Sequence, residues 1–184
     1  DVYKRQGVKK KGTGNDAYLW SWHLWITEEP KLIGGFMDRN LGATSATPSD
    51  GDKTYGLYYQ FGRKDPFTGD IDTDAAGKSL FDPSPKGWRL PSKEEYSNFS
   101  TTTFTWDDSN LGRTYEGNWF PAAGGRCFIN DSMDYLDGYG LYWSSSPYSD
   151  DDKWGCQLYF ENDIVTPSND NSRIYGFSVR CVQE

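Results

Sequence analysis

The strongest constraint on the fold is an alternation of apolar and polar residues in the last third of the chain. Residues 154–161 place Trp154, Cys156, Leu158 and Phe160 at even positions and Gly155, Gln157, Tyr159 and Glu161 at odd positions. A period of two is that of a β-strand with one buried face, so we expect the even side chains to pack inward and the odd ones to meet solvent. Asn162 and Asp163 then predict a hairpin turn into a strand that starts at Ile164 and Val165.

Other segments carry the same pattern more briefly. Phe177, Val179 and Cys181 predict a last strand, with Ser178 and Arg180 on its other face. Residues 36–41 and 56–61 predict two short strands, and residues 62–87 a long loop. Ser92 followed by Glu95 predicts a capping box and a short helix from about Lys93 to Phe99. The predicted class is α+β. Residues 18–26 predict a further strand, whose buried face comprises Tyr18, Trp20, Trp22, Leu24 and Ile26.

Composition excludes several classes of protein. Aromatic residues make up 17% of the 184 residues, which excludes a disordered chain, and this length suits a single domain. There is no apolar run of 18 residues, so no membrane insertion is predicted for this segment. The net charge is −8, and such a surface repels phosphate backbones, so nucleic acid is not an expected partner.

The first residues of the chain differ in character from the rest. The chain begins with Asp1, and residues 1–6 (DVYKRQ) resemble the translation of a sequencing-library adapter. We therefore interpret residues 1–6 as an adapter artefact, residues 7–16 as a linker from a missing N-terminal domain, and residues 17–184 as a single ligand-binding domain. A native basic tail is the alternative reading of this start.

Few residues suggest catalysis or metal binding. His23 is the single histidine, and no nucleophile, base and orienting group are evident around it, so a structural role is favoured. Cys127, Cys156 and Cys181 lack the spacing of a zinc site. Cys156 and Cys181 lie on inward faces of predicted strands, and both a disulfide between them and two buried free thiols remain open.

Two acidic segments have some features of a cation site. Residues 70–74 (DIDTD) have the spacing that begins an EF-hand loop, but Ala75 and Phe81 stand where that loop needs Gly and Glu. Asp150, Asp151 and Asp152 form a second acidic run. A hydrated loop is the favoured interpretation of both, so no metal or cofactor is predicted, and calcium is kept as the alternative.

Several motifs, in order along the chain, resemble a known family, the Fibrobacter succinogenes major paralogous domain. The later motifs are residues 86–92 (KGWRLPS) with 94–96 (EEY), 120–126 (FPAAGGR), 142–146 (YWSSS) and 175–182 (YGFSVRCV). Earlier segments are similar to the version in gut Bacteroidales surface proteins: residues 19–23 (LWSWH), 37–43 (MDRNLGA) and 59–67 (YQFGRKDPF).

The resemblance implies a C-type lectin-like fold of the branch shared with formylglycine-generating enzymes. Such a fold has a twisted, mostly antiparallel sheet, one or two short helices and long loops that present a ligand surface. The enzyme branch uses a pair of late cysteines, but here these cysteines follow strand parity, so that activity is not carried over. The sugar-binding triplets of calcium-dependent lectins are absent, so calcium-mediated sugar binding is not implied.

Residues 143–184 also resemble the variable region of proteins diversified by retroelements, in which adenines of Asn codons are randomised. Such codons never yield Lys, Glu, Gln, Trp or Met, so Lys153, Trp154, Gln157 and Glu161 would be fixed. Gly155 and Tyr159 lie on the expected solvent face, where they can change without opening a cavity. The expected diversified, ligand-binding positions are Tyr148, Asp150, Asp152, Gly155, Tyr159, Ile164, Thr166, Asp170, Ser172 and Tyr175. The expected scaffold positions are Trp143, Trp154, Leu158, Phe160, Val165, Gly176, Phe177 and Val179.

The function implied is a non-enzymatic binding or adhesion module whose loop region at 146–176 meets a protein or glycan receptor on another cell or a phage host. Exposed Tyr with Ser, Asn and Asp is typical of a paratope. The expected location is extracellular, on a cell or virion surface. A non-diversified adhesin and a pilus or cell-envelope subunit of the same fold are the alternatives, and an enzyme related to formylglycine generation is a less favoured class.

Overall fold

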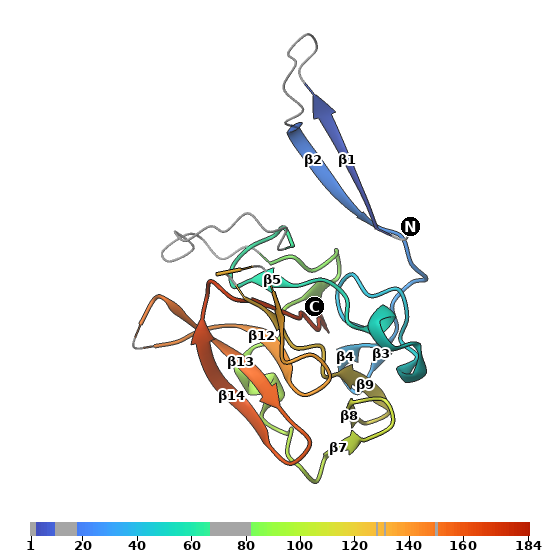
Figure 1. The fold of residues 1–184 in the computed structure, drawn as a ribbon, viewed down its shortest axis with the longest axis vertical. Helices are drawn as coiled ribbons and strands as arrows, with labels where there is room; N and C mark the ends of the chain where they lie inside the picture. Colours follow the sequence, from blue (N-terminus) through green and yellow to red (C-terminus); the bar gives the residue numbers. More distant parts are fainter. Residues whose placement is uncertain (1–2, 10–17, 67–81, 128, 131, 150) are drawn as a thin grey trace.

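The computed structural model describes residues 3–9, 18–66, 82–127, 129–130, 132–149 and 151–184, with side chains described from residue 24 onward. The described chain consists of antiparallel strand pairs with two short 3₁₀ helices, an α+β arrangement (Figure 1). Two isolated parallel bridges, Gly124 with Gly140 and Tyr142 with Ser178, add to these antiparallel pairs.

The strands are short, with two to eight residues each. The 3₁₀ helices are η1 (Pro48–Thr54) and η2 (Lys93–Tyr96). The first eight strands are β1 (Tyr3–Lys9), β2 (Tyr18–Trp25), β3 (Leu32–Ile33), β4 (Phe36–Met37), β5 (Tyr59–Gln60), β6 (Trp88–Arg89), β7 (Phe104–Asp107) and β8 (Gly112–Tyr115). The others are β9 (Asn118–Pro121), β10 (Gly125–Arg126), β11 (Met133–Asp134), β12 (Gly140–Pro147), β13 (Trp154–Phe160), β14 (Val165–Ser172), β15 (Gly176–Phe177) and β16 (Val182–Gln183).

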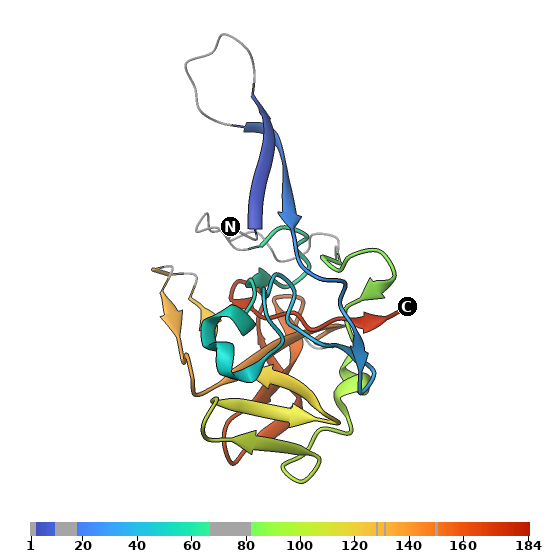
Figure 2. The same ribbon diagram turned by 90° about the vertical axis from the view of Figure 1, so that its right-hand side faces the viewer.

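The strands form small sheets, some of which combine strands that lie far apart in the sequence. Their orders are β1-β2, β11-β10-β15-β5, β12-β13-β14, β3-β4-β16-β6 and β7-β8-β9. The β1–β2 ribbon extends away from the other sheets in both views (Figures 1 and 2). Strand β1 includes residues from both the predicted adapter and the predicted linker, and it pairs with β2 from Tyr3 opposite Trp25 to Lys9 opposite Tyr18.

The expected buried face of residues 18–26 is wrong where side chains are described. Leu24 is 38% exposed and Ile26 is 57% exposed. Trp25, on the opposite parity, packs against the core, and its indole N–H donates to the Ala43 carbonyl at 3.0 Å. The prediction for Tyr18, Trp20, Trp22 and His23 lies outside the described side chains. At this end of β2 the side chain that packs inward is therefore Trp25, on the parity opposite to the predicted one.

The sheet β12-β13-β14 separates two hydrophobic clusters. Side chains of one parity, such as Tyr142, Leu158 and Phe160, belong to the first cluster with Phe36, Phe99 and Phe120. Side chains of the other parity, such as Leu141 and Trp143, belong to the second with Tyr59, Phe61 and Phe177. Both faces of the sheet are therefore covered, and aromatic rings in edge or stacked contacts fill much of the space.

This double cover overturns the expectation that Gly155 and Gln157 of β13 meet solvent, because both are buried. Gly155 was expected to face solvent, but it is buried, and a Cβ added to it would lie 2.4 Å from Phe61 Cδ2. Trp154 was expected inside as scaffold, but it is 37% exposed at the end of the strand. An alternating pattern of apolar and polar residues separates core from solvent only where one face of the sheet is exposed. Both faces of this sheet are covered, so the odd-numbered residues of β13 face a second interior surface.

Other local expectations are confirmed in shortened form. Helix η2 begins after Ser92, whose backbone N–H donates to the Glu95 carboxylate at 2.8 Å, but it ends at Tyr96. The hairpin turn at residues 162–163 is closed by the Glu161 N–H donating to the Ile164 carbonyl at 2.9 Å. The strands expected at 36–41 and 56–61 are reduced to β4 and β5. Much of the expected loop at 62–87 lies outside the described residues.

A buried arginine connects distant segments of the chain. Arg180 is fully buried, and its guanidinium donates to the Met37 and Trp119 carbonyls and to the Asn40 and Asn118 side chains at 2.6–3.0 Å. Its charge also lies 4.1 Å from the centre of the Phe120 ring. The expected last strand is therefore interrupted: β15 ends at Phe177, and β16 begins only at Val182. Both Ser178 and Arg180, on the polar parity, are buried.

Candidate functional site

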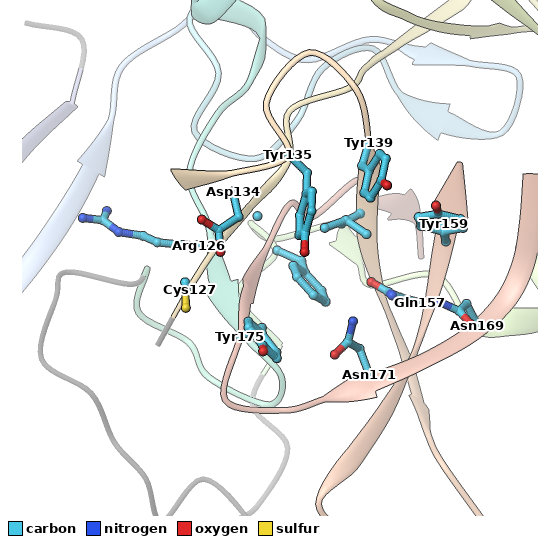
Figure 3. A pocket seen from close by; sticks show the side chains of 13 residues that line it. Arg126, Cys127, Asp134, Tyr135, Tyr139, Gln157, Tyr159, Asn169, Asn171 and Tyr175 are labelled. Carbon is cyan, nitrogen blue, oxygen red and sulfur yellow. The ribbon is translucent and has the colours of Figure 1, made fainter. Parts of the chain in front are cut away.

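A cavity of about 230 Å³ lies beside the C-terminal sheet and opens partly to solvent (Figure 3). It is framed by β10, β11, the loop that follows β11, and the facing strands β13, β14 and β15. Its lining is aromatic and amide-rich: Gly125, Arg126, Cys127, Asp134, Tyr135, Tyr139, Leu141, Gln157, Tyr159, Asn169, Asn171, Tyr175 and Phe177.

Strand pairing brings these residues together from separated parts of the sequence. Strand β10 lies between β11 and β15, which places the loop at 135–139 near Tyr175. Strand β13 pairs with β14 so that Gln157 faces Asn169 and Gly155 faces Asn171. Gly124 has a φ of +62°, and a Cβ there would lie 2.3 Å from the Asp134 carbonyl, so only glycine allows this close turn.

Tyrosine rings form the walls of the cavity. Tyr135 stacks on Tyr139 with ring centres 4.6 Å apart, and Tyr139 meets Tyr159 edge-on at 5.5 Å. On another side Tyr175 stacks on Phe177 at 5.9 Å. Tyr135 is 61% exposed and stands at the cavity mouth, while Tyr139, Tyr159 and Tyr175 are partly buried. The rings therefore offer flat apolar faces to a ligand.

The Gln157 amide is the least satisfied polar group of the cavity. Gln157 is 1% exposed, and neither its Nε2 nor its Oε1 has a hydrogen-bond partner in the described structure. In Figure 3 this amide is drawn amid Tyr139, Tyr159 and Asn171, on the cavity lining. Gln60, another buried glutamine, donates instead to the Ile174 carbonyl at 2.8 Å. Unpaired buried polar atoms also occur outside the cavity lining, at Trp119 Nε1 and Ser178 Oγ.

The charged side chains of the lining either form hydrogen bonds to neighbouring residues or extend away from the tyrosine rings. Asp134 accepts a hydrogen bond from the Ser132 hydroxyl at 2.7 Å. Arg126 extends away from the tyrosine rings in Figure 3. The Tyr159 hydroxyl donates to the Glu161 carboxylate, and burial raises the pKa of Tyr175. The polar character of the cavity thus comes mainly from neutral amides and phenols.

The predicted ligand-binding positions divide among several environments. Tyr159 and Tyr175 line the cavity. Thr166, Asp170 and Ser172 are partly exposed on β14, and Thr166 faces Tyr159 across the strand pair. Tyr148 is partly exposed, and Asp152 and Ile164 are exposed, but none of the three lines the cavity. Gly155 is buried, and Asp150 lies outside the described residues.

The predicted scaffold positions are buried in most cases. Trp143, Leu158, Phe160, Phe177 and Val179 are each at most 2% exposed, and Gly176 is also buried. Val165 is only partly buried against the first cluster, and Trp154 is exposed as described above. Trp143 is anchored further by its indole N–H, which donates to the Tyr59 carbonyl at 2.8 Å.

The three cysteines are free and buried. Burial raises the pKa of the Cys181 thiol to about 12, and burial also raises the pKa of Cys156. Of the two alternatives for Cys156 and Cys181, the structure has the free thiols. The described part of the chain holds no group of three or more His, Cys, Asp or Glu side chains placed to hold a metal ion. The acidic segment at 70–74 lies outside that part.

Eleven of the thirteen cavity residues are not among the ligand contacts predicted from the sequence, and these include Tyr135, Tyr139, Gln157, Asn169 and Asn171. The polar parity of β13 contained a signal for Gln157, because a glutamine between Gly155 and Tyr159 has to be accommodated once that face is covered. No sequence pattern links the loop at 135–139 to β13, because β10 and β15 bring them together through long-range pairing.

Comparison of the chain with protein-family models, with curated proteins and with solved structures gave no match. Among the described residues, no helix is both long and apolar enough to cross a lipid bilayer.

Proposed function

We propose that this chain is a non-enzymatic ligand-binding module with a C-type lectin-like fold, in which the sheet β12-β13-β14 and its loops meet a receptor. The observation that carries the proposal is the position of the expected variable residues. Thr166, Asp170 and Ser172 are partly exposed along β14, which pairs with the strand that carries Tyr159 in the cavity wall. Strand β14 lies at the edge of its sheet and offers polar side chains on both faces: Thr166 lies on the face of Tyr159 and the cavity, and Asp170 and Ser172 lie on the opposite face. The proposed contact surface therefore follows this edge strand and includes the cavity beside it.

The proposed fold is supported by how the family-like segments meet. Arg180, from residues 175–182, donates to the Met37 carbonyl and the Asn40 side chain of residues 37–43. Asn40 donates in turn to the Tyr142 hydroxyl, from residues 142–146, at 3.2 Å. Tyr142 donates to the Pro121 carbonyl, from residues 120–126, at 2.7 Å. Four of the motifs that carry the resemblance are thus in contact around one buried centre.

The chemistry of the cavity favours binding over catalysis. Its lining is dominated by Tyr, Asn and Gln side chains, which supply contact area and hydrogen bonds. The late cysteines, which the related enzyme branch uses as a reactive pair, have raised pKa values, so their thiolates are scarce at neutral pH. A formylglycine-generating activity therefore receives no support from the thiol environment.

The proposed partner is a protein or glycan receptor on another cell or a phage host, and the proposed location is an extracellular cell or virion surface. Retroelement diversification of the C-terminal surface is part of the proposal. It implies a template copy near the coding sequence whose differences are confined to adenines. Sequencing of the flanking locus tests this part: mismatches at all four bases, or the lack of a template and of a reverse transcriptase, would remove it.

Binding itself is tested with the purified domain on glycan and protein arrays. We expect specific binding that falls at least tenfold in the triple variant Thr166→Ala, Asp170→Ala and Ser172→Ala. Thr105→Ala, which is exposed on β7 in another sheet, serves as a matched control and should bind like the wild type. A folded domain that binds nothing on either array, or a triple variant that binds fully, contradicts the proposed surface.

A further inference from the structure

One side of the cavity combines aromatic ring faces with a carboxylate. Tyr135 stacks on Tyr139, with ring centres 4.6 Å and ring planes 10° apart, and because Tyr135 is 61% exposed, its other face is open. Figure 3 draws Tyr135 between Tyr139 and Asp134. Burial raises the pKa of Tyr175, and the nearby Tyr135 and Asp134 raise it further, so these three side chains lie close together. The open face of Tyr135, the Tyr175 ring and the Asp134 carboxylate therefore border the same part of the cavity.

The charges around this part of the cavity favour a cation. Asp134 belongs to the lining, and the Glu161 carboxylate accepts a hydrogen bond from the Tyr159 hydroxyl on the wall. Arg126, the basic residue of the lining, extends away from the tyrosine rings in Figure 3. The face of an aromatic ring is negative because of its quadrupole, so the tyrosines add to the attraction. The net charge of −8 also disfavours an anion.

The acceptor atoms of the lining indicate which kind of cation fits. The described part of the chain holds no group of three or more His, Cys, Asp or Glu side chains placed for a metal ion. Asp134 Oδ1 already accepts a hydrogen bond from the Ser132 hydroxyl at 2.7 Å. Asn171 Oδ1 likewise accepts from the Ser172 N–H at 2.8 Å. A primary ammonium or a guanidinium group brings several N–H donors that need acceptors, whereas a quaternary ammonium group brings none and packs its methyl groups on ring faces.

We infer that the cavity binds a quaternary ammonium group of the choline type, with its methyl groups against Tyr135 and Tyr175 and its charge beside Asp134. This inference rests on the proposed function in treating this part of the surface as the ligand-binding one. It adds the chemical class of the group that a receptor presents to the cavity.

Calorimetric titration with choline and with 3,3-dimethylbutan-1-ol tests the inference. The two molecules have nearly the same shape, but the alcohol has a carbon atom in place of the charged nitrogen. We expect the purified protein to bind choline with millimolar affinity and the alcohol at least tenfold more weakly. Tyr135→Ala and Asp134→Asn should each weaken choline binding severalfold. The matched controls Tyr148→Ala and Asp108→Asn change residues outside the lining and should leave the affinity unchanged.

NMR of choline provides a second measurement that needs no variant. Methyl protons held over a tyrosine face should shift upfield when the wild-type protein is added, and bound choline whose methyl signal does not shift would contradict the predicted contact. If Tyr135→Ala fails to fold, this signal still decides.

Four calorimetric outcomes overturn the inference. They are the lack of choline binding, equal affinity for choline and the alcohol, choline binding that is unchanged in both Tyr135→Ala and Asp134→Asn, and tighter binding of N-acetyl-lysine amide or N-acetyl-arginine amide than of choline. A receptor that is lost in the β14 triple variant of a protein without affinity for choline supports the proposed function and refutes the ammonium site. Choline binding by a protein that binds nothing on either array supports the site and contradicts the proposed function, so the two failures are distinguishable.

Discussion

Replacing Gln157 by methionine should stabilise the ligand-free protein, which is opposite to the usual effect of a substitution in a core. Both polar atoms of Gln157 are buried without partners, and each such atom costs about 1–3 kcal/mol. Methionine is unbranched and nearly as long, and it adapts to irregular space, so it removes this cost without leaving a large void. Allowing for imperfect packing, we expect unfolding to become harder by about 1–2 kcal/mol.

The matched control is Gln60→Met, the same substitution at a satisfied buried glutamine. Gln60 donates to the Ile174 carbonyl at 2.8 Å, and its replacement leaves that carbonyl unpaired. We expect this variant to lose about 1–2 kcal/mol. The two variants should therefore move in opposite directions from the wild type.

Urea denaturation followed by tryptophan fluorescence, together with thermal unfolding, measures the effect. For a chain of this length, 1 kcal/mol corresponds to roughly 2–4 °C in Tm, so the two variants should differ by several degrees. Equal losses in Gln157→Met and Gln60→Met would refute the reasoning, because the Gln157 amide would then be as well satisfied in solution as that of Gln60.

Three further predictions concern packing, exposure and pH. Gly155→Ala should lose about 1–3 kcal/mol because its Cβ would meet Phe61, whereas Gly138→Ala, with no atom closer than 3.8 Å, should change little in the same denaturation assay. Trp143→Ala should lose about 3–5 kcal/mol, and Trp154→Ala clearly less; similar losses would contradict the described burial. Glu95→Gln should lose about 1 kcal/mol at neutral pH, because the Arg89 hydrogen bonds lower the pKa of Glu95 in the folded state. That stability exists above the ordinary carboxyl pKa and is lost as the pH falls through the lowered folded value, so the difference from wild type should vanish in acid; a constant difference across the titration would exclude this origin.

Local patterns in the sequence predicted local structure well and burial less well. The capping box at Ser92 and Glu95 and the hairpin turn at 162–163 depend on neighbouring residues, so the sequence alone was sufficient to find them. The face of β13 that turns inward depends on what covers the sheet. Gly155 is buried because Phe61, almost a hundred residues earlier, packs on it. No period within β13 carries that information.

In the candidate site too, the residues predicted from the sequence are those with a local signal, and the missed residues depend on long-range strand pairing. Tyr159 and Tyr175 were expected at a ligand surface because exposed tyrosine is typical of paratopes. Tyr135 and Tyr139 were missed because the pairing of β10 with both β11 and β15 brings their loop to the cavity. A glutamine at 157 was read as a solvent-facing residue, and only the covered sheet turns it into a cavity residue.

The position of Gln157 constrains how such a surface can vary if it is diversified as proposed. Randomised Asn codons do not yield glutamine, so Gln157 would be a fixed residue, and it lies buried in the lining. Tyrosine is among their products, and Tyr159 and Tyr175 stand on the walls. Replacement of a wall residue changes the shape offered to the ligand, but the donor and acceptor pair of the amide stays. Diversification would therefore change the walls of the cavity while the buried Gln157 amide behind them stays constant.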